Sequence, residues 1–507
     1  MSRVRDFVGR HAGRIGLFVL VLFSGALALI GLLTSTKGTP INSVQTLDGD
    51  ALPAVDDPLF ARSMELYSST RLTPQNRVEL LLNGDGTYPA LWSDLRSATK
   101  TITAQLYYSQ PGAVADTLAV VLRERAGAGV RVLLLLDAFG SGPLEEEYID
   151  GLRASGVNVA WLRPMAWYSL HKASKRSHVR SIVVDGRVGY TGGFGLADYW
   201  LGNGREAGEW RETNVRFWGP AVGQLQAAFA DGWAEATGEL ITGDAFFPPC
   251  SYAVVCTEDG AAVRITELAE PEDLERHRED RREARGGQGI APAAEAPRPD
   301  SARALGANAP DTQRPPGVAT APAYVTEAGL MHAVPSFGST TAERFLALSI
   351  AAARKTLYIA NSYFVPDDDF REMLTGAVQR GVDVRILTVG DSTDIKTTLY
   401  AGRARYEELL NGGVRIYEYQ PTMMHAKTFV VDGVWASVGS MNFDNRSLAL
   451  NNESNLIISD PTFGAKMNAM FLEDLDYAEE ILIDAHRQRP WLDRVKEWGA
   501  NLFSRVL

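Results

Sequence analysis

Two short stretches of the 507-residue chain repeat one spacing of a histidine, a cation and an aspartate, with the aspartate seven residues after the histidine. The residues are His178, Arg180 and Asp185 in the first copy and His425, Lys427 and Asp432 in the second. Side chains two residues apart on a strand point to the same face, so each imidazole is expected beside its cation. This pairing suits attack on a phosphate, because the cation neutralises phosphoryl oxygens while the imidazole acts as nucleophile or proton donor.

Further residues match after each copy. Gly193 and Ser440 each lie 15 residues after their histidine, and such small residues let backbone N–H groups approach a phosphate. Glu212 and Glu453 each open a strand-like run. A carboxylate at this place can hold the Nδ1 atom of an imidazole and leave Nε2 free to attack. We expect these four residues to support the six of the two motifs.

The segments that carry the motifs are themselves repeated. The sequence KTITAQLYYSQP from Lys100 aligns with KTLYIANSYFVP from Lys355, at an offset of 255 residues. Each copy is preceded by a helix-like segment and followed by another helical stretch and a second apolar strand. This alternation predicts an α/β protein with two similar lobes, residues 76–256 and 323–485, each with a mainly parallel or mixed sheet flanked by helices.

Three other segments connect or flank the lobes. Residues 34–75 form a polar connector, and residues 257–322 are charge-dense and then rich in Ala, Pro and Gly, which predicts a flexible linker. Residues 486–507 place Trp and aliphatic residues at helical spacing, which predicts an amphipathic helix. Packing on its own domain and shallow insertion at a lipid surface are both open readings of that helix.

The N-terminus predicts a membrane anchor. Residues 15–33 are uncharged and apolar, long enough for a helix that crosses a bilayer, and residues 1–14 carry four arginines. The positive-inside tendency keeps residues 1–14 in the cytoplasm and exports the catalytic lobes to the outer side of the cell membrane. A cleaved signal peptide is the alternative, and it exports the lobes as well.

Composition narrows the function classes. The net charge is −12, and a nucleic-acid partner is not expected of an acidic chain without a long basic run. Only two cysteines occur, Cys250 and Cys256, without neighbours at zinc spacing. They are either a disulfide, which export would permit, or two free thiols. No metal and no cofactor are predicted.

The chain resembles the phospholipase D superfamily, and within it the bacterial cardiolipin synthases. The likeness lies in the two motifs, in NSYFVPD (residues 361–367) and in VGSMNFDNRSLALNNE (residues 438–453), and it runs from about Val78 to the C-terminus without the linker. It implies that His178 and His425 meet at the interface of the two lobes. One would become a phosphatidyl-histidine and the other would protonate the departing glycerol, so that two phosphatidylglycerols give cardiolipin and glycerol without a metal.

The first copy departs from this family in two places. Arg180 stands where the family has lysine, and Gly195 stands where the second copy has Asn442, a residue expected to donate to the phosphate. These departures keep three alternatives open beside the transferase. They are a phospholipase D that hydrolyses phospholipids to phosphatidic acid, a phosphodiesterase or nuclease, and a degenerate lipid-binding protein.

Overall fold

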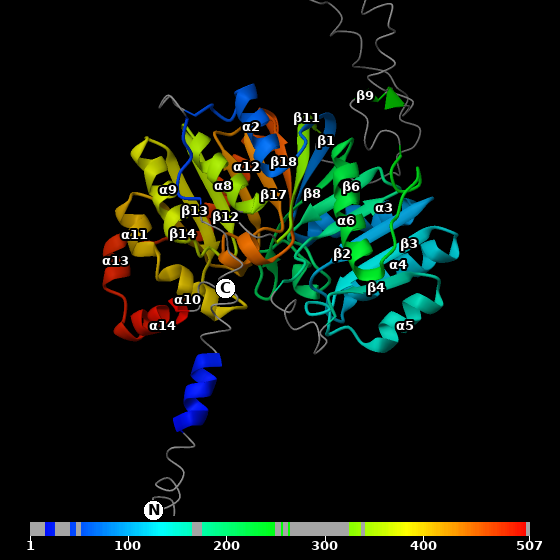
Figure 1. Ribbon diagram of the computed structural model, residues 1–507, viewed down its shortest axis with the longest axis horizontal. Coiled ribbons are helices and arrows are strands. Elements are labelled where there is room, and N and C mark those ends of the chain that lie inside the picture. Colours follow the sequence, from blue (N-terminus) through cyan, green and yellow to red (C-terminus); the bar gives the residue numbers. More distant parts are fainter. Residues whose placement is uncertain are drawn as a thin grey trace, which may run out of the picture.

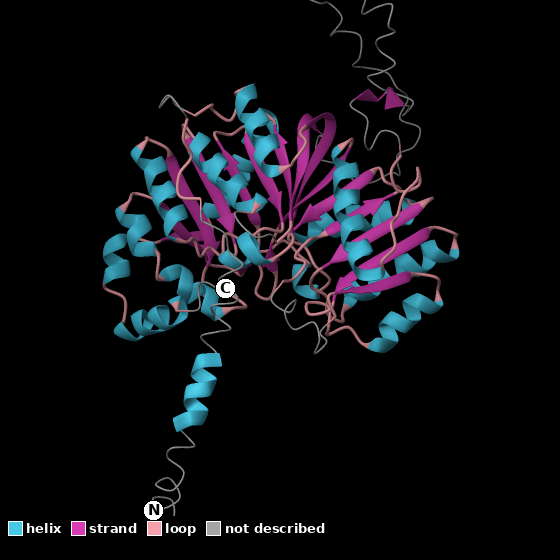
Figure 2. Cartoon of the chain, viewed as in Figure 1, coloured by secondary structure: helices cyan, strands magenta, loops and turns pink. Residues whose placement is uncertain are grey.

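The computed structural model describes residues 16–25, 41–46, 52–164, 175–248, 255–256, 262–263, 324–335 and 340–502. A single large mixed sheet crosses the molecule, with helices packed on its faces (Figures 1 and 2). Its 15 strands follow the order β19-β14-β13-β12-β16-β17-β18-β11-β1-β8-β6-β5-β2-β3-β4. The fold is therefore mixed α/β, as predicted.

The first half, residues 73–248, carries one end of this sheet. Its strands are β1 (Thr73–Leu82), β2 (Thr101–Leu106), β3 (Arg131–Asp137), β4 (Asn158–Leu162), β5 (Ser181–Val184), β6 (Val188–Gly192), β7 (Trp210–Arg211) and β8 (Thr213–Trp218). Its helices are α3 (Asn83–Ser97), α4 (Ala113–Gly127), α5 (Glu146–Ala154) and α6 (Ala221–Thr237).

The second half, residues 324–502, carries the other end. Its strands are β11 (Tyr324–Ala333), β12 (Thr356–Asn361), β13 (Asp383–Val389), β14 (Arg415–Tyr419), β15 (Met423–Met424), β16 (Lys427–Val431), β17 (Trp435–Gly439), β18 (Glu453–Ser459) and β19 (Ala478–Glu480). Its helices are α8 (Thr341–Ala352), α9 (Asp368–Gln379), α10 (Lys396–Arg403), α11 (Tyr406–Asn411), α12 (Pro461–Leu475), α13 (Ile483–Arg487) and α14 (Trp491–Asn501).

Corresponding strands of the two halves pair in corresponding ways. In the first half β2, β3 and β4 run parallel and β5 pairs antiparallel with β2. In the second half β12, β13 and β14 run parallel and β16 pairs antiparallel with β12. The halves do not carry separate sheets, because β1 pairs antiparallel with β11 and joins them edge to edge.

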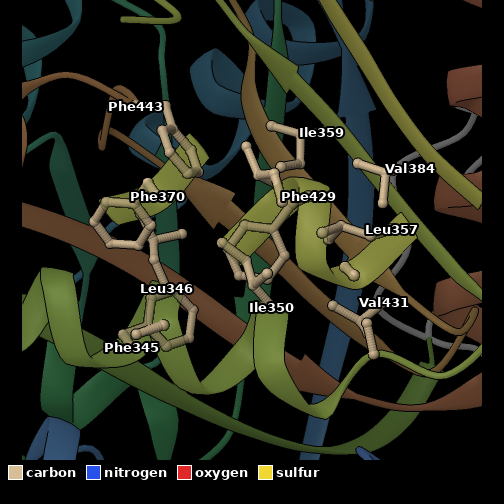
Figure 3. Packing of buried hydrophobic residues seen from close by; sticks show 14 of the residues in the cluster. Phe345, Leu346, Ile350, Leu357, Ile359, Phe370, Val384, Phe429, Val431 and Phe443 are labelled. Carbon is tan, nitrogen blue, oxygen red and sulfur yellow. The ribbon is translucent and has the colours of Figure 1, made fainter. Parts of the chain in front are cut away.

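The core of the second half shows why these residues form a sheet covered by helices. Leu357 and Ile359 alternate along β12, and both side chains face Phe345 and Ile350 of α8 (Figure 3). The intervening residue Tyr358 faces the opposite side and stacks on Phe471 of α12. Because both faces of the strand are covered, β12 reads as a continuous apolar run instead of an alternating one.

Part of the predicted connector is structured. Residues 58–68 form α2 (Pro58–Ser68), whose N-terminus is capped by the Asp57 side chain. Phe60 and Met64, four residues apart, are buried, and the ring of Phe60 lies 4.9 Å from that of Trp435. This helix therefore adds to the core of the second half, where the sequence had predicted only a polar connector.

The predicted flanking segments are described in part. Residues 16–25 of the predicted anchor are helical and exposed, and the rest of the anchor lies outside the described residues. Within the described ranges, no helix is long and apolar enough to cross a membrane. Most of the predicted linker and Cys250 also lie outside them, while residues 255–256 and 262–263 form the short hairpin of β9 (Val255–Cys256) and β10 (Ala262–Val263).

Candidate active site

The two histidines lie at the junction of the halves. His178 precedes β5 and His425 precedes β16, so each stands at the carboxyl end of its half's parallel strands. The backbone N–H of His178 donates to the carbonyl of Asn452 (2.9 Å), and that of His425 donates to the carbonyl of Arg211 (2.8 Å). Each histidine is thus fixed by the backbone of the opposite half.

The same exchange pairs each imidazole with the carboxylate of the other half. Nδ1 of His178 lies 3.0 Å from Oε2 of Glu453, and Nδ1 of His425 lies 2.5 Å from Oε2 of Glu212. All four side chains are buried. A carboxylate at Nδ1 fixes the proton there and leaves Nε2 as the free nitrogen. The two halves therefore complete each other's histidines.

Both cations of the motifs are buried beside the histidines. Lys427 is 1% exposed, and its Nζ donates to the Ser362 hydroxyl (2.8 Å) and to the carbonyl of His425 (2.5 Å). Arg180 is also 1% exposed and donates to the carbonyl of His178 (3.3 Å). Its Nε has no hydrogen-bond partner in the described part of the chain. That donor remains available to an anionic group.

Burial and charge set the protonation of the site. Burial, followed by the charges of Arg180 and Lys427, lowers the pKa of both histidines well below the usual value, so both imidazoles are neutral. Burial also lowers the pKa of Lys427 to about 7 and raises that of Glu453 to about 7. The neutral imidazoles are nucleophiles, and the cations lack an anion of their own size.

Trp200 explains one departure of the first copy. A side chain at Gly195 would place its Cβ 2.6 Å from the Trp200 ring, so the indole occupies the space that an asparagine would need. A Cβ at Gly193 would lie 2.4 Å from the Glu212 carboxylate, which excludes a serine like Ser440. In the second half the Ser440 hydroxyl donates to Glu453 (2.6 Å), and in the first half Nε1 of Trp200 donates to Glu212 (3.3 Å). The indole replaces the hydroxyl as the carboxylate's donor.

We expect Trp200→Phe to lower kcat/KM by about 10-fold, since it removes a hydrogen bond to a charged group. Loss of this donor raises the pKa of Glu212, which must be ionised to hold His425, so the acidic limb of the pH profile moves to higher pH. The pH dependence of kcat/KM measures this shift. Trp233→Phe is the matched control, because the Trp233 indole has no hydrogen-bond partner among the described residues. An unchanged acidic limb in Trp200→Phe would contradict this role.

Aromatic rings line the two histidines unequally. The His425 ring lies 4.8 Å from Trp210, 5.5 Å from Trp200 and 6.5 Å from Tyr363. The His178 ring has Tyr107 at 4.9 Å. Rings around a reactive imidazole exclude water, which favours attack by a bound alcohol. Neither the motif spacing nor the repeat had singled out these aromatic residues; the aromatic-rich runs after β2 and β12 were the available signal.

The motif aspartates lie away from the histidines. Asp185 follows β5 at the opposite end of the strand from His178 and accepts hydrogen bonds from the N–H groups of Thr99, Lys100 and Thr101, at 2.7–2.9 Å. Asp432 accepts three equivalent bonds from residues 354–356. Both aspartates have φ of 52°, a conformation that Asp and Asn tolerate. The prediction that they act in the active site is therefore corrected: they fix the starts of β2 and β12.

Asp185→Asn tests this structural role, because asparagine keeps the turn conformation and removes the charge. We expect the free energy of unfolding to fall by about 2 kcal/mol, measured from urea denaturation. Partial burial works to raise the pKa of Asp185, but its backbone donors outweigh burial and lower it. The stabilisation is therefore complete above the usual pKa of 3.8 and is lost as the pH falls through the lower folded-state pKa, so the difference between the two proteins shrinks in acid. Loss of turnover at unchanged stability would restore a catalytic role.

The remaining predicted residues have mixed positions. Asn442 is buried close after β17, and its side-chain oxygen has no partner within the described ranges, which leaves one end of the amide for a substrate. Among the described residues, no group of three or more His, Cys, Asp and Glu side chains is placed to hold a metal. The structure thus brings together His178, Arg180, Glu212, His425, Lys427, Ser440 and Glu453.

Comparisons with known proteins place this site in a family. The family model described as cardiolipin synthase, PLD-like domain, matches residues 346–475. A cardiolipin synthase of Geobacillus kaustophilus is 31% identical over 434 residues, covering 85% of this chain and 72% of the relative. Cardiolipin synthase A of Pseudomonas syringae is 29% identical over 466 residues, covering 90% and 82%. A crystal structure of phosphatidylserine synthase from Haemophilus influenzae shares the fold, with a TM-score of 0.59, 13% identity, and coverage of 88% of this chain and all of that one.

Proposed function

The chain belongs to the phospholipase D superfamily, in its cardiolipin synthase family, and from this premise we propose that it is a phosphatidyltransferase that makes cardiolipin. It would transfer the phosphatidyl group of one phosphatidylglycerol to a hydroxyl of a second and release glycerol. The observation that carries this proposal is the pair of neutral histidines, each held at Nδ1 by a carboxylate of the other half. A single histidine would serve only one of the two proton transfers.

The first step forms a covalent intermediate. Nε2 of one histidine attacks phosphorus, the bond from phosphorus to the glycerol oxygen breaks, and the second imidazole supplies the proton that glycerol takes away. Arg180 and Lys427 neutralise the phosphoryl oxygens as charge develops on them. These same cations depress the pKa of both histidines. The phosphodiester's negative charge offsets that effect and raises the pKa of the second imidazole, so that it can hold the proton it must give.

The second step reverses the first with a new alcohol. The second imidazole takes the proton from the hydroxyl of the incoming phosphatidylglycerol, whose oxygen attacks phosphorus and displaces the histidine. Two phosphatidylglycerols have then become one cardiolipin and one glycerol. The ring wall of Trp200, Trp210 and Tyr363 beside His425 supports transfer over hydrolysis, because it keeps water from the intermediate.

Membrane attachment belongs to the same proposal. Residues 15–33 would form the anchor, with residues 1–14 in the cytoplasm and the catalytic halves outside, which keeps the site next to lipid substrate. Alkaline carbonate extraction of membranes tests the anchor, and protease added to intact spheroplasts tests the orientation. Release by carbonate would contradict the anchor, and protection of the catalytic halves from protease would contradict their outward orientation.

Mass spectrometry of the lipids formed from phosphatidylglycerol tests the chemistry. The purified protein in detergent, without added metal, is expected to give cardiolipin and glycerol in equal amounts, and His425→Ala to give neither. Phosphatidic acid as the main product would instead identify a phospholipase D that uses water. If the folded protein forms no product, other donor lipids and then a nucleic-acid phosphodiester are the next substrates, and failure with all of them would indicate a lipid-binding protein.

A further inference from the structure

Helix α14 presents an apolar face that nothing in the described structure covers. Trp491, Val495, Trp498 and Leu502 follow one another at three- and four-residue spacing, and Leu492 lies next to them. These five side chains are between 53 and 70% exposed. They form a row along one side of the helix, which we call the α14 apolar face.

The opposite face of α14 already packs on the protein. Ala500 is buried against Ala401 of α10 and Val365, and the buried Glu497 accepts hydrogen bonds from Arg489 at 2.6–3.0 Å. The Nζ of Lys496 lies 5.5 Å from the ring centre of Tyr400. The helix is therefore fixed in place by its other side, and packing on its own domain does not account for the exposed tryptophans.

The α14 apolar face lies at the active-site end of the molecule. Helix α10, on which α14 packs, follows the carboxyl end of β13, and the histidines stand at the carboxyl ends of the parallel strands. Figure 1 shows α10 and α14 on the same side as the exposed apolar helix of residues 16–25. Two more exposed apolar residues follow the same strand ends, Phe139 after β3 and Ile395 after β13.

We propose that the α14 apolar face inserts shallowly into the headgroup region of a phospholipid bilayer and seats the active-site end against it. Tryptophans favour this interface because the ring is apolar and its N–H reaches water, and Arg494 and Lys496 of the same helix suit anionic headgroups. Continuity with the apolar helix of residues 16–25 favours a bilayer over a second copy of the chain. The reason for such a seat rests on the proposed function, since a lipid substrate must reach the histidines from a membrane.

Fluorescence quenching tests the contact without any need for turnover. The full chain is placed in vesicles of phosphatidylglycerol and phosphatidylcholine whose acyl chains carry bromine, which quenches tryptophan at short range. Trp491 and Trp498 are two of ten tryptophans, so we expect roughly a fifth of the emission to be quenched through them and to be missing from the quenched fraction of Trp491→Phe/Trp498→Phe. Equal quenched emission in both proteins would overturn the proposal.

Turnover tests the consequence. We expect Trp491→Ser/Trp498→Ser to lower the rate on phosphatidylglycerol vesicles by about 5-fold and to leave the rate on detergent micelles within about 2-fold. Leu59→Ser/Leu66→Ser is the matched control, because these residues are 65 and 69% exposed on α2, on the other side of the molecule (Figure 1). Equal losses on vesicles and micelles would overturn the seating role, as would light scattering that shows a dimer which the serine substitutions dissociate. If no variant turns over phosphatidylglycerol, the proposed function fails while the quenching result still decides the contact.

Discussion

Replacing His178 or His425 by alanine is expected to lower kcat at least about 10,000-fold, the largest effect of any single substitution in this protein. Each substitution removes either the atom that forms the phosphorus bond or the group that moves the proton, and the remaining histidine cannot do both. Product formation by mass spectrometry, with the protein at high concentration, measures the residual rate. His332→Gln is a control for the loss of a buried histidine outside the site.

The two alanine variants are also expected to fail equally, because each step of the cycle uses both imidazoles. A variant that keeps more than about a hundredth of the parental rate would show that its histidine is replaceable and would contradict the two-histidine mechanism. Alanine leaves a buried carboxylate without its partner, so circular dichroism must first show a folded protein. His178→Asn and His425→Asn retain a polar group beside Glu453 and Glu212 and serve where alanine does not fold.

Lys427→Met is expected to lower kcat/KM by about 1,000-fold, because it removes the charge that neutralises the phosphoryl oxygens in the transition state. Methionine keeps the length and apolar stem of the side chain, so packing changes little. Arg180→Lys restores the family's residue, keeps the charge and is expected to leave kcat/KM within about 10-fold. A larger loss in Arg180→Lys would show that the planar guanidinium is required at that position.

The pH profile gives a second measurement at Lys427. Burial lowers the pKa of this lysine to about 7, opposed by Glu212 and reinforced by Arg180. A lysine is charged below its pKa, so kcat/KM is expected to fall as the pH rises through about 7. The bound phosphodiester raises this pKa, which moves the corresponding limb of kcat to higher pH. Lys427→Arg keeps its charge across this range and is expected to remove the basic limb, while a limb that stays in place belongs to another group.

Much of the site could be predicted from the sequence because its chemistry depends on residue types at fixed spacing. The two histidine motifs, the cations beside them and the two glutamates are visible as matching positions of one repeat. The repeat also predicts matching strands, and β2 and β12 occupy equivalent places in the sheet. Local spacing along a strand decides which side chains share a face, so this part of the prediction required no knowledge of the tertiary structure.

Other parts depend on contacts between residues far apart in the chain. The motif aspartates share the spacing of the histidines, yet strand direction carries them to the other end of the sheet, where backbone N–H groups bind them. The role of Trp200 was hidden because it fills space left by two glycines, Gly193 and Gly195. A substitution that is compensated by a distant ring looks like a loss in the sequence alone.

The sequence by itself determined which residues are available for phosphoryl chemistry, that they occur twice and that the strands bearing them belong to an α/β fold. Only the tertiary structure decided that His178 is held by Glu453 and His425 by Glu212, across the junction of the halves. The reason is physical. Spacing fixes neighbours within one strand, whereas these pairs form because β1 joins β11 and the backbone of each half bonds to the histidine of the other.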